Sequence, residues 1–214
     1  MTSRQRRRLI SLALFAIVIG LYLYHQHQQN QRPALGPQIN TIACGVHCGT
    51  ERWLVKTLAD ADVASVNFSP RPTTVAWLTS QPAPSPLPAD TRVAPLELQA
   101  FTVRAQLIGI KEEGDRDFHI VLADPNDPSV TMIAEIPSSE CSGACSSHYA
   151  ASFESARHEL ESRFGMPPTN GFENVPGNII VDVTGVAFFD FFHDQRGVAP
   201  NAIELHPVLA LHFE

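Results

Sequence analysis

A change in the hydrophobic pattern after Pro95 constrains the fold of this chain more than any other feature. From Phe101 to Gly109 apolar residues alternate with polar ones, which is the pattern of a half-buried β-strand. Four more segments are typical of strands, and an amphipathic helix with one apolar stripe separates the third from the fourth. The expected strands are 101–109, 118–123, 131–136, 179–190 and 203–213, and the expected helix is 148–164.

This order of three strands, one helix and two strands is that of an OB-fold, a five-stranded, partly open Greek-key barrel. Gly109 and Gly185 lie inside the long first and fourth strands, where glycine relieves the bends that a small barrel needs. A β-sandwich would need about seven strands. We therefore predict a mainly β fold with one helix, an OB-fold-like five-stranded Greek-key barrel over residues 96–214.

An uncharged apolar run from Leu9 to Tyr24 lies near the start of the chain. At about 1.5 Å per residue it nearly spans a bilayer core of about 30 Å. The basic residues in front of it indicate a cytoplasmic N-terminus, and the polar run behind it lacks a small-residue cleavage site. We expect a cytoplasmic basic tail at 1–8, an uncleaved transmembrane signal-anchor helix at 9–24, and a flexible linker at 25–43 leading to a domain outside the cytoplasm.

Residues 44–95 do not show the alternation of the later strands. Residues 51–64 carry apolar side chains at mixed helical spacings, which indicates a short helix or an irregular buried segment. Prolines then crowd the stretch from Pro70 to Pro95 and exclude a regular helix or a central strand there. We predict an irregular, Pro-rich wrap over the core of the barrel.

The charge of the chain is distributed unevenly. Five of the 15 basic residues and none of the 22 acidic ones lie in residues 1–32, so the remainder carries 10 basic and 22 acidic residues, a net charge of −12. Nucleic-acid binding depends largely on Lys and Arg that neutralise phosphates. Although OB-folds often bind nucleic acid, we do not expect it as a partner here.

Four cysteines form two C-x3-C pairs, Cys44 with Cys48 and Cys141 with Cys145. Such spacings suit either a four-thiolate zinc site or disulfide bonds. A location outside the cytoplasm favours disulfides, for which three connectivities are possible. We expect pairing across the chain, Cys44 or Cys48 with Cys141 or Cys145, which ties the N-terminal segment to the barrel.

A polar set near the C-terminus is the sharpest candidate for chemistry. On the last strand Glu204 and His206 share the face opposite Leu205, and His119 faces away from the apolar side of the second strand. Together with His193 they would form an imidazole and carboxylate set of the kind that binds zinc with an open position for water. The same residues also suit an outward edge-strand face and a polar turn, and no H-E-x-x-H spacing makes the metal set specific. Asp194 and Asn201, from the same loop, are further candidate binding residues.

Other site classes lack their motifs. The sequence contains neither G-x-S-x-G nor a Gly-rich phosphate loop before a helix. An enzyme of the staphylococcal-nuclease type would need clustered carboxylates and a second arginine beside Arg104. Residues 124–128 favour a turn over a calcium loop.

Four stretches resemble a group of uncharacterised bacterial exported proteins. They are Cys48–Thr57, Asp117–Leu122, Val183–Val186 and Gly197–Val208, and the NAIELHPV-like ending within the last is the most distinctive. The likeness covers most of residues 48–213. It implies a bacterial envelope origin and a shared OB-like domain, and it implies no activity.

These observations lead to one expected function and one alternative. The first is a single-pass membrane protein of the cell envelope, whose acidic OB-like domain is a non-catalytic module that binds a protein or another ligand, without a cofactor. The alternative is a metal-dependent envelope hydrolase, with zinc held by His119, His193, Glu204 and His206. The two differ in whether these side chains converge on one point.

Overall fold

The computed structural model describes residues 44–214, which belong to one compact unit. The predicted basic tail, transmembrane helix and linker, residues 1–43, lie outside the described residues. Among the helices within 44–214, none has the length and apolar composition needed to cross a bilayer.

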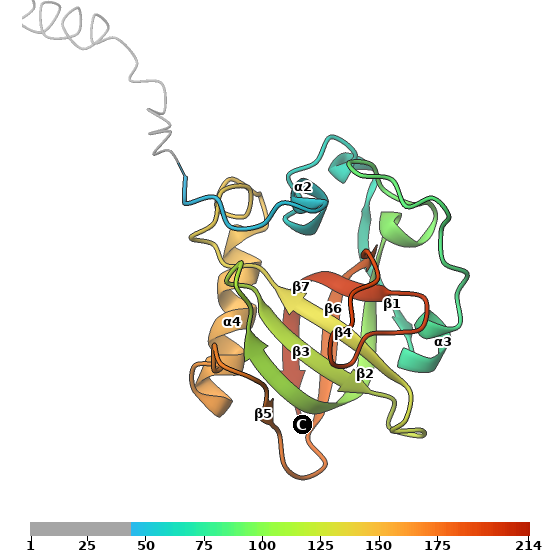
Figure 1. Ribbon diagram of the computed structural model, residues 1–214, viewed down its shortest axis with the longest axis vertical. Coiled ribbons are helices and arrows are strands. Elements are labelled where there is room, and N and C mark those ends of the chain that lie inside the picture. The colour runs from blue at the N-terminus through green and yellow to red at the C-terminus, as the bar shows by residue number, and fades with distance from the viewer. Residues whose placement is uncertain (1–43) are drawn as a thin grey trace, which may run out of the picture. The chain divides into compact units, whose positions relative to one another are not determined.

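Five strands form a closed barrel (Figure 1). Neighbouring strands pair antiparallel around it, except for one parallel pair, β4 with β7, and β2 closes it by pairing with both β3 and β6. The long helix α4 connects the third strand to the fourth. This is the topology of an OB-like barrel, as the sequence predicted. The strands are β2 (Gln99–Glu112), β3 (Phe118–Ala123), β4 (Thr131–Ile136), β6 (Ile180–Phe189) and β7 (Ile203–Phe213), and the helix is α4 (Ala150–Phe164).

The core fills the barrel from alternate positions of these strands and from one face of α4. Inward residues are apolar on every strand, and α4 contributes Phe153, Ala156 and Leu160, which are all buried. The predicted stripe of the helix is therefore the one that it buries. The largest fully buried side chains include Phe101, Phe118, Leu107, Ile120 and Leu122.

Gly185 lies where β6 bends against β7, beside two shifts of register. A Cβ atom there would come within 2.8 Å of the backbone oxygen of Pro207 and 3.1 Å of Leu205 Cβ. At Gly109, beside the register shift of β2 against β3, the nearest atom would be the mobile guanidinium end of Arg196, at 3.4 Å. The sequence assigned both glycines to bends, but only Gly185 is in close contact with backbone atoms.

We expect Gly185→Ala to lower the free energy of unfolding by about 1–3 kcal/mol, because the added methyl group has no space without a backbone shift. Gly109→Ala is the matched control and should change that free energy by less than about 1 kcal/mol, since a side-chain end can move aside. Guanidinium unfolding of both variants measures the difference. Equal losses at the two positions would contradict the argument from close packing at Gly185.

Residues 44–98 contain more regular structure than the predicted wrap. The edge strand β1 pairs parallel with β2 and carries Pro70 and Pro72, which an edge strand tolerates. The predicted fold class, with one helix, also counted too few helices, because short helices form where a few apolar side chains reach the core. The additional elements are α2 (Trp53–Lys56), η1 (Val63–Ser65), β1 (Asn67–Thr73), α3 (Val75–Thr79) and η2 (Leu96–Leu98), and farther along the chain β5 (Glu173–Asn174).

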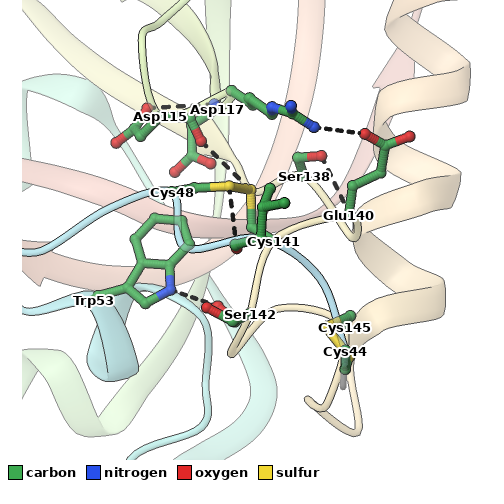
Figure 2. The surroundings of a disulfide bond; sticks show 12 residues. Cys44, Cys48, Trp53, Asp115, Asp117, Ser138, Glu140, Cys141, Ser142 and Cys145 are labelled. Carbon is green, nitrogen blue, oxygen red and sulfur yellow. Dashed lines mark hydrogen bonds and ion pairs between the residues drawn. A yellow bond between two sulfur atoms is a disulfide. The ribbon is translucent and has the colours of Figure 1, made fainter. Parts of the chain in front are cut away.

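Two disulfide bonds tie the start of the described chain to the segment before α4 (Figure 2). Cys44 is bonded to Cys145 and Cys48 to Cys141, so the pairing across the chain is confirmed and the two bridges are nested. The Trp53 indole N–H donates to the carbonyl of Ser142 at 2.6 Å, beside the inner bridge. The four-thiolate zinc alternative is excluded, since all four thiols are consumed.

Candidate functional site

The barrel strands carry a second buried face, on the side away from the core. Because side chains alternate along a strand, residues between the core positions point outward. The outward residues of β3, β4 and β7 include four buried polar side chains, which residues 49–60 and the loops 113–117 and 190–202 cover. They are His119, Glu135, Glu204 and His206, all between 0 and 5% exposed.

His206 is at the centre of this buried face. Its Nε2 lies 3.2 Å from Asp117 Oδ2, and its Nδ1 lies 3.1 Å from Glu135 Oε2 and 3.7 Å from Glu204 Oε2. Its ring also contacts Phe188 edge-on, with 5.4 Å between centroids. Three carboxylates therefore surround one imidazole that is wholly buried.

Glu135 links His206 to a second histidine. The other oxygen of Glu135 lies 3.1 Å from His119 Nδ1, and Glu113 Oε1 lies 3.6 Å from the same nitrogen. On its far side, His119 Nε2 is 3.1 Å from the carbonyl of Arg196. A carbonyl can only accept, so Nε2 carries a proton and Nδ1 is the nitrogen that faces the carboxylates.

Burial and the neighbouring charges shift the pKa values of the two histidines and of Glu135 in opposite directions. Burial would lower the pKa of His206, but contact with Asp117, Glu135 and Glu204 holds it well above its ordinary value. The pKa of His119 is likewise raised, against burial, by Glu135. Burial would raise the pKa of Glu135, but the two histidines and the charge of Lys56 hold it well below its usual range.

The other two buried carboxyl groups hold their protons more tightly than usual. Burial raises the pKa of Glu204 to about 7, since the charges of Glu135 and Asp190 add to it and contact with His206 only partly offsets it. Burial also raises the pKa of Asp117 to about 6, against the effect of His206. The face thus combines one strongly ionised carboxylate with two that take up protons near neutrality.

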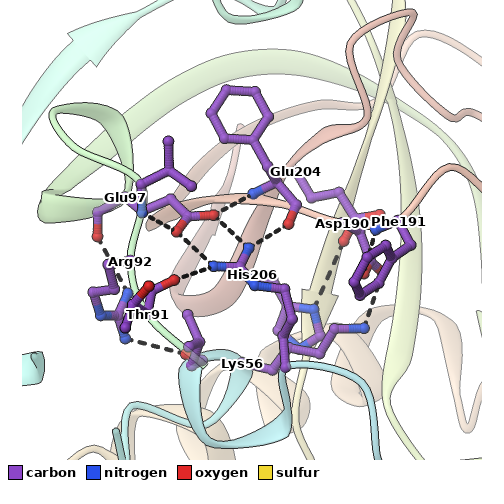
Figure 3. A network of polar contacts seen from close by, with 12 residues as sticks. Lys56, Thr91, Arg92, Glu97, Asp190, Phe191, Glu204 and His206 are labelled. Atoms are coloured by element: carbon purple, nitrogen blue, oxygen red, sulfur yellow. Dashed lines mark hydrogen bonds and ion pairs between the residues drawn. The ribbon is translucent and has the colours of Figure 1, made fainter. Parts of the chain in front are cut away.

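Ion pairs from residues 52–97 form a layer over this face (Figure 3). Lys56 and Arg52, four residues apart and on one side of α2, both lie over the Phe188 ring. Lys56 Nζ is 2.9 Å from Asp190 Oδ2. Burial would lower the pKa of Lys56, but the negative charges of Glu135, Asp190 and Glu204 outweigh it and raise this pKa. Arg52 binds Glu97 and Arg92 binds Asp60, each through two nitrogens.

An acidic pocket of about 280 Å³ lies beside the covered face. Glu51 is exposed at its rim, and the buried Glu135 is at its inner end, where the pocket meets the histidine cluster. The ammonium of Lys56 is already bound to Asp190. The ionisable groups of the lining are Glu51, Lys56, Glu113, Asp115, Glu135, Asp190 and His193.

The structure places three of the four residues predicted for the metal set, His119, Glu204 and His206, in one cluster around Glu135. Their own donor atoms do not form one close group among the described residues. The fourth, His193, is separate, with its Nε2 3.1 Å from Glu51 at the pocket rim. Of the other candidate binding residues, Asp194 is exposed in the same loop. The amide of Asn201 is used inside the protein, where it donates to the carbonyls of Leu78 and Gln81.

The sequence reasoning missed Asp117, Glu135 and Lys56 as members of the site. A signal was present for Glu135, a charged residue inside the strand T-M-I-A-E-I, whose pairing partner on β3 is His119. Asp117 lies in the loop between β2 and β3, and Lys56 comes from a segment whose position over the barrel the sequence does not reveal.

Comparisons with known proteins add little to this geometry. No protein-family model matches the chain, and no curated protein matches it either. Among solved structures, it is similar to the crystal structure of a "putative aspartyl-tRNA synthetase" from Leishmania major Friedlin. The identity is 15%, the TM-score is 0.36, and the match covers 70% of this chain and 22% of that one. Both measures are too low to bear on fold or function.

Proposed function

We propose that this protein is a non-catalytic binding protein held at a membrane, whose OB-like domain takes a cationic group of its ligand into the acidic pocket. The main support is the lining of that pocket, which has five carboxyl groups and one ammonium group. That ammonium belongs to Lys56 and is already paired with Asp190. The loops 113–117 and 190–202 that border it join the first to the second and the fourth to the fifth barrel strand. Loops at these two places bind ligands in many OB-folds.

The size and charge of the pocket support one class of ligand. About 280 Å³ is enough for one ammonium- or guanidinium-bearing side chain, and is small for a whole cofactor. The net charge of −12 over residues 33–214 adds a long-range attraction for a basic partner. We therefore assign the pocket to an amine or guanidinium group, carried by a protein or peptide of the envelope.

The membrane part of the proposal is supported by the run Leu9–Tyr24, the arginines before it and the two disulfides. Disulfides persist in oxidising compartments, which agrees with a domain outside the cytoplasm. Protease added to the outside of spheroplasts should digest this domain. A domain protected until the membrane is lysed would contradict the orientation.

Binding of fluorescein-labelled hexalysine, followed by anisotropy, tests the ligand class. The double variant Glu51→Gln/Asp115→Asn should bind roughly two- to thirtyfold more weakly, since each charge near the surface contributes about 0.2–1 kcal/mol. Wild-type affinity should also fall as salt rises.

The matched control is Glu140→Gln/Glu159→Gln, which removes the same net charge away from the pocket lining. It should bind hexalysine about as well as wild type. An equal loss in both double variants would assign the binding to overall charge and would remove the pocket from the function.

A further inference from the structure

We propose that Asp117, Glu135 and His206 bind one divalent metal ion beneath the acidic pocket, with zinc as the ion that fits best. The proposal concerns an inorganic ion at buried residues and does not rest on the organic cation assigned to the pocket above. It differs from the metal set predicted from the sequence, which included His193 and lacked Asp117 and Glu135.

The positions of the three side chains suit a common ion. One donor atom from each lies within 4.8 Å of the others, and the three residues are 0, 5 and 0% exposed. His206 contacts Asp117 at 3.2 Å through Nε2 and Glu135 at 3.1 Å through Nδ1. An ion binds one ring nitrogen, so one of these contacts joins two of its ligands, and the other carboxylate lies within the 4.8 Å spacing of the group.

The donor atoms of Asp117 and His206 have no hydrogen-bond partners within residues 44–214. Among the described residues, both oxygens of Asp117 and both ring nitrogens of His206 have no hydrogen bond, because the contacts between them are close but poorly aligned. Glu204 Oε2 and His119 Nδ1 are also buried without a hydrogen bond. Buried polar groups are almost always hydrogen-bonded, so a cluster of unpartnered atoms indicates an ion or water among them.

The tautomers of the histidines favour a cation. His119 donates from Nε2 to the Arg196 carbonyl, so its neutral form would direct the Nδ1 lone pair at the Glu135 carboxylate. His206 has carboxylates at both ring nitrogens, so its neutral form would direct one lone pair at a carboxylate as well. A cation beside Glu135 and His206 offsets the repulsion at His206.

The chemistry of the donors selects the kind of ion. Two carboxylates and one imidazole suit zinc, and three protein ligands leave a fourth position open. Thiolates are absent from the set, since both cysteine pairs are oxidised. Glu135 belongs both to this group and to the pocket lining, which gives the ion a route inward.

A second group, Glu51, Asp190 and His193, also has close donor atoms. It is the weaker candidate because Asp190 already binds the ammonium of Lys56 at 2.9 Å, and that charge repels a metal ion. His193 and Glu51 already contact each other at the rim. His193→Gln therefore serves as the control for the buried site.

Zinc content of the full-length oxidised protein, purified in detergent and stripped with a chelator, tests the proposal. After incubation with Zn²⁺ and gel filtration, mass spectrometry of the metal should give about one zinc per chain for wild type and for His193→Gln. Asp117→Asn and His206→Gln should each retain less than about a tenth of that amount, since each lacks one of three ligands.

A measurement on wild type alone covers the case in which these variants fail to fold. Two-bond proton–nitrogen NMR spectra of the histidine rings should show a large shift of a His206 ring nitrogen on addition of Zn²⁺, with His193 unchanged. Metal-free wild type with unshifted His206 signals would overturn the site and assign the cluster to protons alone. Zinc that both triad variants retain, or that His193→Gln loses, would also overturn it.

Discussion

Removing both disulfides, by changing all four cysteines to serine, should lower the free energy of unfolding by about 4–5 kcal/mol. The bridges close loops of 101 and 93 residues, and an open chain of that length gains much conformational entropy when it unfolds. Guanidinium unfolding of wild type and variant under non-reducing conditions measures the loss. We expect it to be among the largest single effects in this protein.

Because the bridges are nested, removing one should have a much smaller effect than removing both. Either remaining bridge still closes nearly the same loop, so the entropy that one bridge restricts is largely restricted by the other. Cys44→Ser/Cys145→Ser should lose less than about 2 kcal/mol, and Cys48→Ser/Cys141→Ser somewhat more, because Cys141 is fully buried in the core. Single-bridge losses that add up to the double loss would contradict this account of shared loop closure.

Glu97→Ala should lower the free energy of unfolding by about 3–5 kcal/mol, because it leaves the guanidinium of Arg52 buried without its counter-charge. Both side chains of this pair are wholly buried, and the carboxylate also accepts from the backbone N–H groups of Phe189 and Val93. The residue thus joins residues 52 and 93 to the end of β6. Chemical unfolding of the oxidised protein is the measurement.

The double variant Arg52→Leu/Glu97→Leu distinguishes the cost of an unpaired buried charge from the cost of lost side-chain packing. Replacing both members by apolar residues removes the stranded charge, so the double variant should be more stable than Glu97→Ala by at least about 1 kcal/mol. Lys56→Met is a control for general effects at α2, since its partner Asp190 is more exposed than Glu97 and can gain water. A double variant as unstable as Glu97→Ala would show that geometry, rather than the unpaired charge, dominates.

The barrel could be predicted because its signal is local. Alternation along the strands, Pro137 after the third strand and the apolar stripe of α4 each depend on residues close in sequence. Apart from a short helix within 51–64, which the sequence left open, the short elements before Pro95 were missed for the opposite reason. A strand such as β1 forms because β2 offers it an edge, and its own sequence, with Pro70 and Pro72, argues against a strand.

The candidate site was predicted in part for a related reason. The outward direction of His119, Glu204 and His206 follows from strand periodicity, and their convergence follows from the barrel. Whether an outward face is wet or buried depends on what covers it. Two disulfides, Glu97 and Asp190 hold the segment carrying Arg52 and Lys56 over this face.

By itself, the sequence predicted the OB-like order of strands and helix and the pairing of cysteines across the chain, and it determined the acidic charge of residues 33–214. The tertiary structure alone decided which bridges form, which polar residues are buried, and that Asp117 and Glu135 share His206 while His193 does not. The physical reason is distance along the chain. Periodicity gives the direction in which a side chain points, whereas the partner it meets there can come from far along the chain, 89 positions away for Asp117 and His206 and 134 for Lys56 and Asp190.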